Sequence, residues 1–130
     1  MNRGHINISK IESYLYSIMY KTVSDNTYAG TLPDTISSSW TDMCLIDCGT
    51  SIRDFDAYGR GTVLIWLYAR PLADGTKNTA QMSRLEDRLN GVIANVSSHE
   101  FRISRVGTYS DYDADRKWHC NIVELNLIIY

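Results

Sequence analysis

Every position from Val63 to Tyr68 is apolar, so this segment predicts a strand that buries both of its faces. Such a strand lies inside a sheet and not at its edge. We expect it to span about Arg60 to Arg70, because Pro71 and the Asp74-Gly75 pair then stop it.

Two other segments repeat their apolar residues with the spacing of a helix. The first runs from Ser9 to about Val23, where Ser9 and Glu12 form a capping-box pattern. The second begins near Asn78, with Gln81 as a weaker capping partner. Its apolar stripe, which continues past the unfavourable Asn90-Gly91 pair, consists of Met82, Leu85, Leu89, Val92, Ile93 and Val96.

The remaining apolar segments predict shorter or half-exposed strands. These are a short strand within Thr27–Leu32, then Trp40–Asp47, Phe101–Tyr109 and Trp118–Tyr130, the last two joined by an acidic hairpin tip at Tyr112–Arg116. Gly49–Gly61 is expected to be a loop or the frayed start of the central strand. Together the segments predict one α+β domain over residues 1–130, with a mainly antiparallel sheet of about four to five strands packed against two helices.

Composition narrows the class of protein. The formal net charge is −2 and 22% of the residues are charged, which argues against a protein that coats nucleic acid with a basic face. No run of 18 apolar residues predicts a membrane-spanning helix, and the N-terminus lacks the pattern of a secretory signal. We therefore expect synthesis and folding in a cytoplasm.

Three residue patterns raise the question of a reactive or metal site. Zinc would need tighter spacing than Cys44, Cys48, His119 and Cys120 have, and we expect the three cysteines to be reduced and buried. Asp111, Asp113 and Asp115 resemble the start of a calcium loop, but Arg116 and Ile122 replace its glycine and its final acid. No catalytic signature surrounds Cys120, His99 or His119, and Gly59-Arg60-Gly61 lacks the context of a phosphate loop. No enzyme activity, cofactor or metal is expected.

Aromatic residues and two polar segments point to contact surfaces instead. The chain has nine tyrosines and three tryptophans, types that are enriched at protein interfaces. The polar segments Gly49–Gly61 and Ser110–Lys117 are long for so small a domain. Segments of this kind are typical of surfaces that reach a neighbouring molecule.

The order of elements, together with the segment Asp-Ala-Tyr-Gly-Arg-Gly-Thr-Val-Leu-Ile-Trp-Leu-Tyr-Ala-Arg and the following Lys77-Asn78, resembles the tail terminator proteins of tailed bacteriophages, also called tail completion or minor tail proteins. The resemblance implies a virion protein, assembled in the host cytoplasm, that forms a ring, commonly a hexamer, on the end of the tail tube. The ring stops tube polymerisation and provides the docking surface for the head or neck. DNA passes through the lumen without specific binding, and no membrane is involved.

The resemblance supplies no catalytic residues, so only contact regions are nominated. The candidates are Arg53, Asp54, Asp56, Tyr58 and Arg60 on the first segment and Tyr112, Asp113, Asp115, Arg116 and Lys117 on the second. Two alternatives stay open. One is another head–tail connector or neck protein, and the other is a small dimeric α+β-barrel enzyme or ligand-binding protein.

Overall fold

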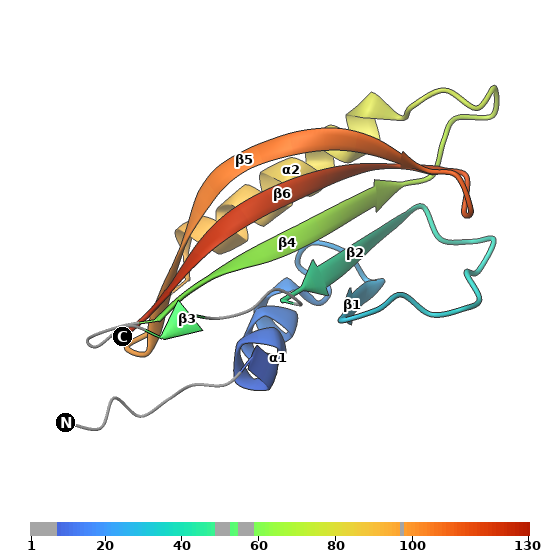
Figure 1. Ribbon diagram of the computed structural model, residues 1–130. Coiled ribbons are helices and arrows are strands. Elements are labelled where there is room, and N and C mark those ends of the chain that lie inside the picture. The colour runs from blue at the N-terminus through green and yellow to red at the C-terminus, as the bar shows by residue number, and fades with distance from the viewer. Residues whose placement is uncertain (1–7, 49–52, 55–58, 97) are drawn as a thin grey trace.

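The computed structural model describes residues 8–48, 53–54, 59–96 and 98–130 (Figure 1). Its two helices are α1 (Ile8–Met19) and α2 (Thr79–Ala94). Its strands, in chain order, are β1 (Thr27–Ala29), β2 (Asp42–Asp47), β3 (Arg53–Asp54), β4 (Gly59–Ala69), β5 (Phe101–Asp113) and β6 (Trp118–Ile129).

The strands form one sheet in the order β1-β2-β4-β6-β5, with β3 also paired to β4. Among the described strands, only the β1–β2 pair is parallel. The predicted α+β class, a mainly antiparallel sheet against two helices, is confirmed. Across the described residues the sheet has six strands, because the two-residue β3 forms within the segment expected to be a loop or a frayed strand start.

Both helices pack on the same side of the sheet, which we call the helix side. Leu15 of α1 and Leu85 of α2 join Ile65 of β4 there, and all three side chains are fully buried. Figure 1 shows α2 behind β5 and β6. On the opposite, open side, the segment 30–41 covers only a smaller cluster that consists of Leu32, Met43, Tyr68, Trp118 and Cys120.

The prediction that the central strand buries both faces is therefore only partly correct. Val63, Ile65 and Leu67 of β4 are fully buried on the helix side. On the open side Tyr68 is buried, but Leu64 and Trp66 are only half-buried. The difference arises because the segment 30–41 covers one end of the open side, whereas both helices cover the other side.

The helix boundaries differ from the prediction at α1 and agree with it at α2. Ser9 lies inside α1, so the predicted capping box is wrong, and α1 ends at Met19 and not at Val23. It ends there because Lys21 adopts a left-handed backbone (φ +65°), after which the Thr22 and Val23 amides both donate to the Met19 carbonyl. At α2 the Asn78 side chain accepts from the Gln81 amide at 3.1 Å, and the helix continues through Gly91.

The closing hairpin is longer than predicted. β5 extends to Asp113 and the turn occupies residues 114–117, so Tyr112 and Asp113 belong to the strand and not to the tip. A β-bulge between Arg105 and Gly107 leaves Val106 without a partner on β6.

Candidate interaction surfaces

The first predicted contact region lies where β3 meets the start of β4, and we call it the β3 end. Arg53 is directly opposite Arg60 in the ladder, and Asp54 is opposite Gly59. The Arg60 side chain is exposed. The other two residues nominated for this region, Asp56 and Tyr58, lie outside the described residues. The register thus places two arginine positions directly opposite one another.

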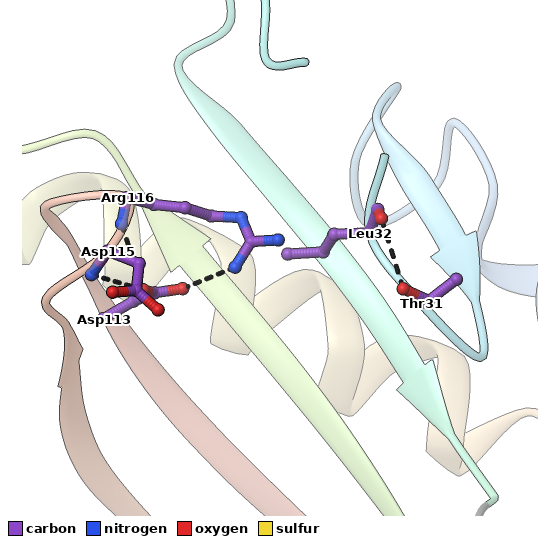
Figure 2. Close-up of polar contacts among 5 residues, drawn as sticks. All are labelled: Thr31, Leu32, Asp113, Asp115 and Arg116. Atoms are coloured by element: carbon purple, nitrogen blue, oxygen red, sulfur yellow. Dashed lines mark hydrogen bonds and ion pairs between the residues drawn. The ribbon is translucent and has the colours of Figure 1, made fainter. Parts of the chain in front are cut away.

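The second predicted region, Ser110–Lys117, comprises the end of β5 and the connection to β6, and we call Asp113 together with residues 114–117 the hairpin turn. One carboxylate organises it: Asp113 Oδ1 accepts from the Asp115 and Arg116 amides, both at 3.1 Å, as Figure 2 shows. Asp113 Oδ2 also forms an ion pair with Arg116 Nη1 at 3.0 Å. The Lys117 amide closes the turn by donating to the Asp113 carbonyl at 2.7 Å, with a positive φ of 60° at Lys117.

These contacts divide the nominated residues of the hairpin turn by role. Asp113 and Arg116 hold its shape, and Figure 2 shows the Arg116 side chain extending toward Leu32 on the open side. Asp115 and Lys117 are exposed. Tyr112, just before the turn, is 47% exposed and lies against the His119 ring with a centroid distance of 4.9 Å. The exposed Asp115, Lys117 and Tyr112 side chains are the ones that can reach a neighbour.

The structure places the two regions at opposite ends of the sheet and not in one site. Gly59 pairs with Ile129 at the β3 end, whereas Ala69 pairs with His119 next to the hairpin turn. At about 3.3 Å per residue, the ten steps of β4 separate the two ends by roughly 33 Å. A single partner group therefore does not bridge them, but two different neighbours can.

A third polar feature, which local sequence patterns do not predict, surrounds Asp42 at the start of β2. This carboxylate is only 8% exposed, and it accepts hydrogen bonds from Ser24 Oγ and from Gln81 Nε2, both at 2.5 Å. Gln81 Oε1 in turn accepts from the Arg84 guanidinium. The network joins β2, α2 and the turn after α1. In the sequence, the only sign of this network is a lone aspartate next to an apolar run, because the partners of Asp42 are remote from it in the chain.

A polar cleft of about 600 Å³ opens beside this network. Its lining includes Lys21, Ser24, Asn26, Trp40, Asp42 and Arg88. One Arg88 N–H group donates to the Val23 carbonyl at 3.3 Å. Cys44, Cys120 and His119, the residues considered for reactive or metal chemistry, do not line this cleft.

The cysteines lie on different sides of the sheet. Cys44 and Cys48 belong to the helix-side core, whereas Cys120 lies in the cluster on the open side. Burial raises the pKa of Cys44 and Cys48 to about 12 and that of Cys120 to about 11, so all three thiols are protonated at neutral pH. The described residues contain no group of three or more His, Cys, Asp or Glu side chains placed to hold a metal ion.

Within the described residues, α1 and α2 both fall short of what a helix needs in length and apolar content to cross a bilayer.

Comparison with known proteins finds no relative. The chain matches no model of a known protein family and no curated protein sequence.

Proposed function

We propose that this chain is a structural subunit that associates head-to-tail into a ring on the end of a bacteriophage tail tube, where it stops tube growth and offers the head or neck a docking surface. The observation that carries the proposal is the placement of two polar contact regions at opposite ends of one sheet. A head-to-tail interface joins two different patches of the same subunit, and it closes into a ring when its rotation allows.

The charges of the two regions support such a contact. The β3 end sets Arg53 opposite Arg60, and the hairpin turn of a neighbouring copy would bring the exposed Asp115 carboxylate to them. Opposite charges across an interface favour correct register and faster association. The order of helices and strands also agrees with the order on which the family resemblance rests.

The partners in this proposal are further copies of the chain, commonly six, the tail tube protein and a neck or head-completion protein. DNA crosses the lumen without specific binding. A formal net charge of −2 suits that role, since lysine and arginine contacts to phosphate would slow the DNA. The same surfaces also suit another head–tail connector or neck protein, which would differ in the partner bound at each face.

The test reverses both charges at the β3 end. We expect Arg53→Glu with Arg60→Glu to keep its thermal unfolding midpoint but to lose ring formation, measured by native mass spectrometry, and to leave phage tails of irregular length in electron micrographs. Lys10→Glu with Lys21→Glu, on and just after α1, is the matched control. Tails of normal length with the Arg53/Arg60 variant would remove the β3 end from the proposal.

A ligand-binding role has one observation in its favour, the polar cleft beside Asp42. Convergent polar groups at a concave surface are typical of small-molecule sites. A small molecule that stays bound to the native protein in mass spectrometry, and is lost in Asp42→Ala, would support this alternative over the ring.

A further inference from the structure

The outer edge of β5 is the longest free strand edge in the described part of the chain. β5 spans 13 residues and pairs only with β6, so the backbone groups on its other side have no strand partner among the described residues. Figure 1 shows β5 at the rim of the sheet. Val106, Tyr109 and Tyr112 are 61%, 50% and 47% exposed along it.

This edge has few of the features that keep free edges apart. Proteins usually protect such an edge with lysine, proline, a bulge or a covering segment. β5 contains neither lysine nor proline, and it has one bulge, at Val106. The long edge with exposed tyrosines is therefore suited to pairing with another strand.

The charged side chains along β5 change sign at the bulge. Arg102 and Arg105 precede it, and Asp111 and Asp113 follow it. The bulge also shifts the alternation of the side chains. As a result Arg102, opposite Ile128, shares the open side with Asp111, opposite Cys120, and with Asp113, opposite Trp118.

From this arrangement we infer that two copies of the chain pair antiparallel through their β5 edges, around a two-fold axis close to Gly107. One register around this axis keeps the open sides of the copies together, and it sets Arg102 of each copy opposite Asp111 of the other. Directly opposed charges of unlike sign stabilise an antiparallel pair. A second copy is thus the occupant that the charge pattern fits.

This contact is distinct from the head-to-tail contact proposed above and does not rest on it. A two-fold interface uses the same patch on both copies, whereas a ring contact uses two patches. The two-fold contact pairs free subunits, or joins two rings to one another. Its failure and the failure of the ring are measured separately.

A cysteine at the axis tests the pairing directly. Gly107→Cys fits the strand, since a Cβ at this position meets no atom within 4 Å and its φ is not positive. In this register residue 107 of one copy lies directly opposite residue 107 of the other, with Cα atoms about 5 Å apart, within disulfide reach. We expect this variant to form a covalent dimer under mild oxidation at least tenfold faster than Tyr20→Cys, a similarly accessible cysteine away from the edge.

Charge exchange tests the register. Arg102→Asp is expected to raise the dimer dissociation constant on the order of tenfold, because two symmetric attractions become repulsions, and Asp111→Arg in the same chain should restore it. Gly107→Cys introduced into the Arg53/Arg60 variant should cross-link normally, and circular dichroism checks that each variant is folded.

Equal cross-linking of the Gly107→Cys and Tyr20→Cys variants would overturn the proposal, as would a dimer that is insensitive to charge at Arg102. If the Gly107→Cys variant cross-linked only to a different tail protein in assembled particles, the β5 edge would be a binding site for that protein and not for a second copy.

Discussion

Gln81 Nε2 of α2 lies 2.5 Å from Asp42 Oδ2 of β2, and this contact fastens the start of α2 to the sheet. The same carboxylate accepts from Ser24 Oγ at 2.5 Å, beyond the end of α1. One buried carboxylate therefore fixes the positions of both helices relative to β2. Gln81 was expected to complete the N-terminal cap of α2, but its side chain serves this network instead.

The first prediction concerns that carboxylate. Asp42→Ala should lower the free energy of unfolding by about 2–3 kcal/mol, because it leaves two buried donors, Ser24 Oγ and Gln81 Nε2, without an acceptor. Urea denaturation measures the change. Asp25→Ala, at an exposed neighbouring position, should stay within about 0.5 kcal/mol of the parent. Equal effects of the two substitutions would contradict a structural role for Asp42.

The second prediction concerns the helix-side core. Leu85 is fully buried between α2 and the sheet, and Leu85→Ala should cost about 2–5 kcal/mol through lost burial and the cavity that remains. The matched control is Leu72→Ala, at a side chain that is 49% exposed, where we expect little change. An unchanged melting temperature for Leu85→Ala would show that this helix face does not meet the core.

The third prediction is a gain of stability. Gly91 lies within α2, and a Cβ there meets no atom within 4 Å. Gly91→Ala should raise the free energy of unfolding by about 0.5–1 kcal/mol, since alanine restricts the unfolded chain and favours the helix. Gly75→Ala should do the opposite, because Gly75 has a φ of +86° that alanine adopts with strain. A loss of stability in Gly91→Ala would indicate that α2 is broken at this point.

The fourth prediction concerns alkaline pH. Burial raises the pKa of Cys44 from its ordinary value of 9.0 to about 12, so the folded state holds the thiol proton more tightly than the unfolded state. The contribution of this pKa difference to the free energy of unfolding is fully present below pH 9 and is lost as the pH rises toward 12. Between these values Cys44 alone should lower the free energy of unfolding by about 1.4 kcal/mol per pH unit.

Urea titrations at pH 8, 9.5 and 10.5 measure that slope. Cys44→Ala should be less stable at pH 8 but should show a shallower decline, and the remaining decline includes contributions from Cys48, Cys120 and Tyr68, whose pKa values burial also raises. If the slopes of the parent and the variant were the same, Cys44 would not titrate in the folded protein as its burial implies.

Local patterns in the sequence were enough to predict the elements whose burial follows a simple period. The alternation of Val123, Leu125 and Leu127 predicted the last strand, and these side chains are buried on one side of β6. The apolar stripe of the second helix, with Leu85 and Leu89, likewise faces the core. In both cases the residues that form the element also determine what it buries.

The features that were missed depend on contacts between distant residues. The predicted strand ended at Tyr109 and was followed by the polar segment Ser110–Lys117, yet Ser110 to Asp113 continue β5 because they pair with Asn121 to Trp118 of β6. The end of α1 depends on a left-handed lysine, which residue type alone does not favour. The Asp42 network joins residues 18 and 39 positions apart in the chain.

The central position of β4 has a mechanical consequence. This strand is paired along one side by β2 and β3 and along the other by β6, and its two ends lie next to the β3 end and the hairpin turn. A pulling force between neighbours attached at those ends enters at Arg60 of β4 and leaves through the hairpin turn, which continues into β6, so it crosses the ladder between β4 and β6. It loads the hydrogen bonds of that ladder in shear, so that many must break at once before the subunit extends.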